Sequence, residues 1–311
     1  MAALLDKRLI FVTGKGGVGK STVAIALGLV AARSGLRCIV AELAAQERIQ
    51  RAFDHEGEHF AEVQLAHNLF TISIDPQHAM EEYLRIKAGP LGHALSASRV
   101  FNAFAMATPG MRELLSIGKV WELAQLERRT SDAAPYDLVI VDAPATGHGL
   151  GILKTPRTFA EIAMVGPIAH QGRAIADTID DRSFTGIVAV ATPEEMPVNE
   201  TLALGEALEH DGLGLDAVVV NALYPRRFSD DGDLSSLNAA LAATTDAHAR
   251  AALKAALSEH ARASSQREQR DRLAASLRSE PIELPYLFVS ELGPEQLESL
   301  ADVLEPGLRA G

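Results

Sequence analysis

The stretch TGKGGVGKST, residues 13–22, constrains this chain more than any other part of it. It follows a short apolar run, RLIFVTG, and precedes a helical pattern, so it lies between a predicted strand and a predicted helix. Gly14, Gly19, Lys20 and Ser21 match G-x-x-x-x-G-K-[ST], a loop whose backbone N–H groups surround a phosphate. A glycine-rich turn without a ligand is the plain alternative, and the strand–loop–helix context argues against it.

The chemistry of this loop gives its polar residues separate roles. The Lys20 ammonium reaches the β- and γ-phosphates of a nucleotide, and the Ser21 hydroxyl is a ligand for Mg²⁺. The helix that begins at Ser21 adds the positive end of its dipole. We therefore expect a bound nucleotide with Mg²⁺. The residues predicted to hold it are Gly14, Gly16, Gly17, Val18, Gly19, Lys20, Ser21 and Thr22.

Further apolar runs are continuous rather than alternating, and they predict strands buried on both faces. They are residues 36–42, 68–75, 136–142, 186–192, 216–221 and 282–288. Such strands with helices between them indicate a mostly parallel central sheet flanked by helices, so the fold class is α/β, a P-loop NTPase. Residues of about 78–132 and 228–280 are long and helical, and we interpret them as a helical subdomain and additions to one domain over residues 1–311.

Composition narrows the class of protein. The formal net charge of −12 argues against a surface that binds nucleic acid, because phosphate contacts need a basic stripe. A single cysteine, Cys38, cannot form an intrachain disulfide or a zinc cage and suits a reducing compartment. The sequence has no signal-peptide pattern and no run of about 20 apolar residues, so we expect a cytoplasmic protein.

Lys15 is a second lysine in the loop and makes the stretch GKGGVGKS. This pattern resembles the deviant Walker A signature of a class of ATPases. The resemblance implies that Lys15 crosses the interface of a homodimer and contacts the phosphates of ATP bound by the other subunit. A cation supplied in trans stabilises transition-state charge much as an arginine finger does. An exposed lysine without such a role is the alternative.

Residues 136–156, YDLVIVDAPATGHGLGILKTP, resemble the switch segment of the ArsA/GET family, the arsenite-pump and tail-anchored-protein targeting ATPases. The resemblance implies that Asp142 is the Walker B acid, which holds Mg²⁺ through water. It also implies a nucleotide-sensing switch at Thr146, Gly147 and His148. The family's arginine is absent here, because LGIL replaces LRLL, which weakens any transfer of how the family relays its nucleotide state.

Two later stretches resemble the same family in the expected order. ATPEEMPVNET, residues 191–201, and VVVNALYP, residues 218–225, imply that Glu194 and Asn221 lie at the nucleotide. The Asn221 amide both donates and accepts, as the adenine edge does, and a turn cap at the strand end is the alternative. ELPYLFVSELG resembles the family loop that packs on the base.

The first switch departs from the family pattern D-P-A-H. The second strand ends in VAELAAQERI, so Glu42 stands where the family has its catalytic aspartate and no histidine follows. Glu42 either still orients the attacking water or serves as a cap or salt-bridge partner. The similar motif IDPQH follows the third strand, and Asp75 there is predicted to be a helix N-cap.

The resemblance to the ArsA/GET family also bears on which metals and clients the chain could bind. Neither a thiolate-bound metalloid nor an interface zinc is expected, because Cys38 is alone. Residues of about 95–125 correspond to the helices that form a groove for a hydrophobic client helix in the targeting factors, although they could equally pack onto the body of the protein. The candidate groove residues are Phe101, Phe104, Met106, Met111, Leu114, Leu115 and Trp121.

The predicted function is a homodimeric, Mg²⁺-dependent ATPase whose nucleotide cycle opens and closes the dimer and controls binding of a client or membrane partner. A nucleotide-dependent binding switch with little hydrolysis is the alternative. A partitioning or septum-site ATPase would need a basic DNA-facing surface or a C-terminal membrane helix. A nitrogenase-reductase-like electron carrier would need two cluster cysteines per subunit, and the chain has one cysteine.

Overall fold

The structure is a computed structural model. It describes residues 4–43, 47–55, 60–96, 107–129, 133–163, 167–228 and 231–310. The strands are β1 (Leu9–Gly14), β2 (Cys38–Glu42), β3 (Val63–Ala66), β4 (Leu69–Ser73), β5 (Leu138–Asp142), β6 (Thr185–Ala191), β7 (Ala217–Leu223) and β8 (Ile282–Pro285). A 3-10 turn spans Leu4–Asp6, and the helices are α1 (Lys20–Arg33), α2 (Arg48–Ala52), α3 (Pro76–Ser96), α5 (Met111–Leu123), α6 (Thr146–Ala163), α7 (Pro167–Asp180), α8 (Glu195–His210), α9 (Asp231–Ala243), α10 (Ala247–Leu277) and α11 (Pro294–Ala310).

Within the described residues, eight strands form one sheet in the order β3-β4-β2-β5-β1-β6-β7-β8. Every neighbouring pair is parallel except β3 and β4. The predicted α/β class with a mostly parallel sheet is confirmed. Strands from both halves of the sequence belong to this sheet.

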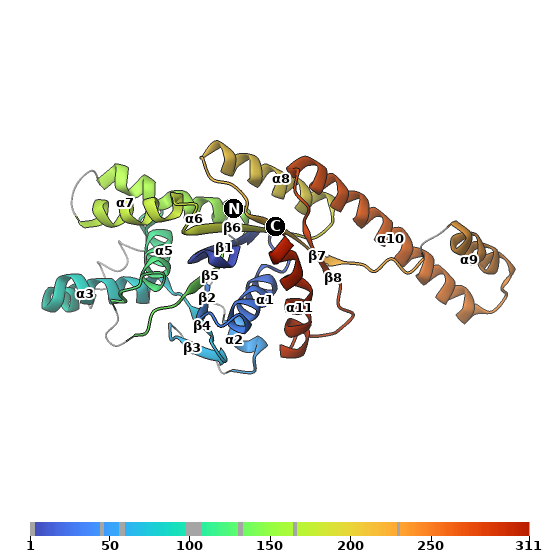
Figure 1. Cartoon of the computed structure of the whole chain (residues 1–311), viewed down its shortest axis with the longest axis horizontal. Coiled ribbons are helices and arrows are strands. Elements are labelled where there is room, and N and C mark those ends of the chain that lie inside the picture. Colours follow the sequence, from blue (N-terminus) through green and yellow to red (C-terminus); the bar gives the residue numbers. More distant parts are fainter. Residues whose placement is uncertain are drawn as a thin grey trace.

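The two faces of the sheet bury two separate cores, because alternate side chains of a strand point to opposite faces. On β1, Ile10 and Val12 pack into the core that α1 and α11 cover, whereas Leu9 and Phe11 pack into the core of α5 to α8. Figure 1 shows α1 and α11 on one side of the sheet and α6 to α8 on the other. The strands are continuously apolar because helices cover both faces of the sheet, as predicted.

Local signals account for two helix ends, one of which, the cap by Asp75, was predicted. Asp75 caps α3, because its Oδ1 accepts from the backbone N–H groups of Gln77 (3.0 Å) and His78 (2.9 Å). Gly35 follows α1 with a φ of 89°, a left-handed conformation that ends a helix. The strand expected over 282–288 is shorter, since β8 ends at Pro285.

The helical additions lie at opposite ends of the sheet. Residues 78–132 include most of α3 and all of α5, and residues 228–280 include α9 and α10. Helix α10 leaves the body beside α8, and its N-terminal part projects away with α9 packed against it (Figure 1). The sequence did not predict β3. Its four residues, VQLA, are partly exposed at the sheet edge and carry little of the apolar pattern that identifies a strand.

Candidate functional site

A cavity of about 570 Å³ lies beyond the carboxyl ends of β1, β2 and β5. This is the edge where parallel α/β sheets bind their ligands, and the volume falls within the range of ligand pockets. The described residues that line it are Gly16, Gly17, Gly19, Lys20, Ser21, Thr22, Ile25, Glu42, Arg48, Ala52, Asp142, Ala143, Pro144, Ala145, Leu292 and Leu297. Four stretches singled out in the sequence therefore meet at one cavity: the phosphate loop, the altered first switch, the segment that begins at Asp142 and the loop that contains Leu292.

The phosphate loop is held from behind by Asn221. The Asn221 Nδ2 donates to the Val18 carbonyl over 2.9 Å and lies against Gly19. Asn221 sits where the pairing of β7 with β8 shifts register, and Ala222 after it has a φ of 61°. Such an irregularity re-aims a side chain, which is how a strand residue comes to contact the loop. Asn221 itself does not line the cavity among the described residues.

Ser21 and Asp142 meet at the inner wall of the cavity. The Ser21 hydroxyl donates to Asp142 Oδ2 over 2.5 Å, and Lys20 Nζ donates to the Lys15 carbonyl over 3.0 Å. Burial raises the pKa of Asp142, against the opposing effects of the Ser21 hydrogen bond and the Lys20 charge. Burial also lowers the pKa of Lys20. A buried carboxylate beside a hydroxyl offers the hard oxygen ligands that Mg²⁺ prefers, so these two residues fit the ion.

Glu42 lies at the same level of the sheet as Asp142, since the two residues are register partners on β2 and β5. Its carboxylate accepts from the Arg48 backbone N–H, at 3.1 Å for Oε2 and 3.3 Å for Oε1, and so caps α2. Burial raises the pKa of Glu42, and the Arg48 hydrogen bond offsets part of that rise. The side chain thus lines the cavity and caps a helix at once.

Lys15 does not line the cavity of its own chain. Its ammonium forms an ion pair with Glu200 on α8, and the two side chains are 31% and 33% exposed. An ion pair this exposed contributes roughly 0–1 kcal/mol to stability, so it orients the Lys15 side chain but holds it there only weakly.

The remaining predicted residues lie around the cavity or beyond its lining. Gly14 ends β1, and Val18 contributes its carbonyl to the Asn221 bond. Glu194 is exposed at the N-cap of α8 and its side chain makes no capping hydrogen bond. Thr146, Gly147 and His148 form the first turn of α6, directly after the cavity residues Pro144 and Ala145, and their side chains lie outside what the structure describes.

The sequence model of the anion-transporting ATPase family, ArsA, matches residues 7–168 and 163–244 of this chain. These ranges contain the loop, Glu42, Asp142 and Asn221. The chain belongs to the ArsA ATPase family. The resemblance stated from the motifs is therefore confirmed.

Similar proteins carry names of both branches. ATPase BagA of Mycobacterium tuberculosis is 33% identical over 227 residues, which are 70% of this chain and 66% of that protein. ATPase get3 of Sclerotinia sclerotiorum is 24% identical, over 74% of this chain and 77% of its own length. The arsenical pump-driving ATPase of Acidiphilium multivorum is 26% identical, over 73% of this chain and 41% of its own length. The chain thus spans just under two thirds of the length of its mycobacterial relative.

Two further observations concern the cysteine and the helices of this member of the ArsA ATPase family. Cys38 is fully buried in β2, and burial raises the pKa of its thiol far above the ordinary value, so the metal-binding thiolate is disfavoured. In the part of the chain that the structure describes, no helix is long and apolar enough to cross a membrane.

Sequence reasoning missed Arg48, Glu200 and Leu292. Glu200 stands in the recognised stretch ATPEEMPVNET, but its pairing with Lys15 joins positions 185 residues apart. Leu292 belongs to the recognised loop ELPYLFVSELG and forms part of the apolar wall. Arg48 follows the altered first switch, where the family pattern gave no signal for a cation.

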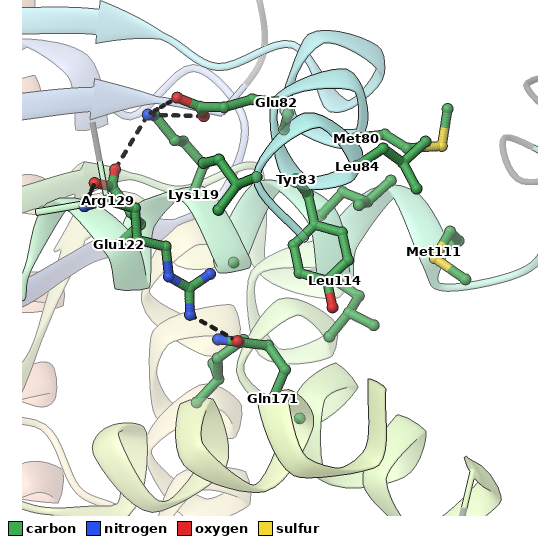
Figure 2. Close-up of a pocket in the computed structure, with 16 residues that line it drawn as sticks. Met80, Glu82, Tyr83, Leu84, Met111, Leu114, Lys119, Glu122, Arg129 and Gln171 are labelled. Atoms are coloured by element: carbon green, nitrogen blue, oxygen red, sulfur yellow. Dashed lines mark hydrogen bonds and ion pairs between the residues drawn. The ribbon is translucent and has the colours of Figure 1, made fainter. Parts of the chain in front are cut away.

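A second, smaller cavity of about 160 Å³ lies among α3, α5 and α7 (Figure 2). Of the candidate groove residues, Met111, Leu114 and Leu115 line it, together with Met80, Tyr83, Leu84 and Ile86 of α3. Phe101, Phe104 and Met106 lie outside the described residues. Trp121 does not line the cavity; its Nε1 donates to Thr178 Oγ1 over 2.9 Å.

Charged side chains close one side of this smaller cavity. Lys119 pairs with Glu82 at 2.9 Å and with Glu122 at 3.1 Å, and Arg129 Nη2 donates to Gln171 Oε1 over 2.8 Å (Figure 2). The Lys119–Glu82 ion pair ties α5 to α3, and the Arg129 hydrogen bond ties the segment that follows α5 to α7.

Gly19→Ala tests the support of the phosphate loop, with Gly35→Ala as its control. Both glycines have a left-handed φ, 92° and 89°, but only at Gly19 would an added Cβ approach Asn221 Nδ2, to 2.2 Å. Both variants incur backbone strain of roughly 1–2 kcal/mol. Gly19→Ala must also displace Asn221 from Val18, so we expect its nucleotide affinity to fall at least about 10-fold.

Nucleotide titration of purified variants, with thermal unfolding alongside, measures both effects. Gly35→Ala is expected to bind nucleotide as the wild type does. Equal affinity of the two variants would contradict the role given to the Asn221 contact.

Proposed function

We propose that this chain is a Mg²⁺-dependent ATPase that works as a homodimer, in which ATP binding and hydrolysis close and open the dimer and control binding of an apolar client. The observation that carries the proposal is the division of the two loop lysines. Lys20 lines the phosphate cavity, whereas Lys15 turns away from it toward α8. A lysine that leaves its own phosphates can serve those of a second subunit.

Within one subunit, Lys20 binds the β- and γ-phosphates of ATP, and the loop N–H groups surround them. Ser21 and Asp142 hold Mg²⁺, which neutralises phosphate charge when it is bound. Burial disfavours the charged form of Asp142, and a divalent cation relieves that penalty. These residues account for ATP and Mg²⁺ as the ligands of the site.

The adenine is proposed to contact the Asn221 side-chain amide. One N–H of Asn221 Nδ2 already donates to the Val18 carbonyl, so Oδ1 remains to accept from the adenine amino group and the second N–H remains to donate. Leu292, from the loop that resembles the family's base-packing segment, supplies an apolar surface on the cavity wall. Glu194 is proposed to approach the nucleotide only in the ATP-bound dimer, because it is exposed here.

Glu42 is proposed to orient the attacking water. It lines the cavity beside Asp142, and its raised pKa makes it a stronger base than an ordinary glutamate. Its hydrogen bond from Arg48 supports the competing role as a cap of α2. Glu42→Gln separates the two roles, because glutamine retains an acceptor for the cap but loses the charge.

Steady-state ATPase assays with Mg²⁺, together with light scattering for mass, test the function. We expect Lys20→Ala to lose ATP binding, and Lys15→Ala to bind ATP, to dimerise more weakly and to turn over on the order of 10³ more slowly. Glu42→Gln should lose turnover and keep its stability. Lys254→Ala, an exposed lysine of α10, is the control and should match the wild type.

Two results would contradict the proposal. ATP binding by the wild type without turnover would favour the nucleotide-dependent binding switch. Wild-type activity and mass in Lys15→Ala would reject the shared site.

The proposed client is an apolar helix that inserts side chains into the cavity among α3, α5 and α7. The cavity wall carries Met80 and Met111, and methionine adapts to varied apolar shapes. Ile86 on its lining is 41% exposed, so apolar surface extends outward from it. One helical turn, about 10 Å across and 5.4 Å long, is larger than about 160 Å³, so side chains rather than the helix backbone would enter.

Binding of a fluorescent, 20-residue apolar helical peptide tests this surface. Leu115→Glu puts a charge into the cavity and is expected to weaken binding roughly 10-fold or more, because it removes apolar burial. The matched control is Leu126→Glu, at a leucine that is 69% exposed and lies outside the cavity lining. Unchanged binding by Leu115→Glu, or the same loss in both variants, would exclude the cavity as the client site.

A further inference from the structure

Arg48 is a cation of the phosphate cavity that none of the recognised motifs explains. It is the first residue of α2 and lines the cavity together with Lys20, Ser21 and Asp142. The residue is exposed, and its guanidinium makes no hydrogen bond or ion pair with any residue in the described ranges. Arg51, one turn further along, instead pairs with Glu47 at 3.6 Å, and its side chain is 70% exposed.

The backbone and the side chain of Arg48 have separate partners. The backbone N–H donates to the Glu42 carboxylate and fixes the start of α2 against the end of β2. This contact does not use the guanidinium. A substitution of the side chain therefore leaves the Glu42 cap in place.

Arg48 lines the same cavity as Lys20, Asp142 and Glu42. Its backbone contact with the Glu42 carboxylate places the residue beside the carboxyl end of β2. Lys20, Asp142 and Glu42 are the residues assigned to the β- and γ-phosphates, the Mg²⁺ ion and the attacking water.

The balance of charges on the cavity lining gives a physical reason for a cation at Arg48. The charged residues among the described lining are Lys20, Arg48, Glu42 and Asp142, so the two cations offset the two carboxylates. Without Arg48 the protein groups of the lining would carry a net negative charge, and they would attract less strongly the triphosphate that arrives with Mg²⁺. Arginine is also suited to phosphate, because its planar fork donates two parallel hydrogen bonds.

We propose that Arg48 binds the terminal phosphate of ATP as a cation supplied in cis, and that it makes the site favour ATP over ADP. The inference rests on the proposed function, since it assigns a further residue to the same nucleotide site. Lys15 would then be the cation supplied by the partner subunit, and Arg48 the cation supplied by the subunit that holds the nucleotide.

Equilibrium binding of ADP and of a non-hydrolysable ATP analogue, both with Mg²⁺, tests the assignment. Arg48→Ala is expected to weaken the ATP analogue roughly 10- to 100-fold, the range of a lost charge-assisted hydrogen bond, and to leave ADP within about 3-fold. Arg48→Lys should fall between, since it keeps the charge but loses the fork. Arg51→Ala should behave as the wild type, and thermal unfolding of each variant checks that the fold is intact.

The outcomes separate the inference from the proposed function. Equal losses of ATP analogue and ADP in Arg48→Ala would mean a structural role through α2 and would overturn the inference, as would no loss at all. If the wild type bound neither nucleotide, the proposed function would fail and the inference with it. Wild-type binding of ATP with an unaffected Arg48→Ala would overturn the inference alone.

Discussion

The phosphate loop is anchored to the ends of two buried strands, β1 and β5, and the rest of the site depends on this constraint. Its N-terminal end continues β1, which pairs with β5 so that Val12 lies opposite Asp142. Its C-terminal end begins α1, where Ser21 donates to Asp142. From the other side Asn221 holds the Val18 carbonyl. Because both strands are buried on both faces, the loop has little freedom to shift, and its backbone is ready for a phosphate before one binds.

This rigid centre contrasts with the contacts at its rim. Lys15 and Glu200 form an ion pair that is about a third exposed and worth roughly 0–1 kcal/mol. In the proposed dimer, a phosphate in a drier, shared site would offer Lys15 a stronger, charge-assisted contact, so Lys15 would exchange Glu200 for the partner's nucleotide. Glu42 and Arg48 both line the cavity, and the Arg48 backbone N–H, at the start of the short helix α2, donates to the Glu42 carboxylate. A nucleotide that engages the Arg48 side chain and the Glu42 carboxylate together would act on this helix.

The elements and contacts that could be predicted from the sequence are those with strong local signals. The continuous apolar runs of β1, β2 and β5 require cover on both faces, and the loop motif requires its strand and helix. The Asp75 cap was equally local. The sequence missed β3, whose partial exposure gives it no pattern, and the pairs that join distant positions, Lys15 with Glu200 and Asn221 with Val18. Such pairs depend on which strand neighbours which, and spacing along the chain does not contain that information.

A mixing experiment tests the central claim, that each subunit lends Lys15 to its neighbour's ATP. Lys15→Ala binds nucleotide but lends nothing, and Lys20→Ala lends Lys15 but binds nothing, so each alone is expected to be inactive. An equimolar mixture forms heterodimers with one complete site, and the account predicts about a quarter of the wild-type turnover for random pairing of a symmetric dimer. If the mixture stays as inactive as its components while heterodimers form, Lys15 does not act across the interface and the account is wrong.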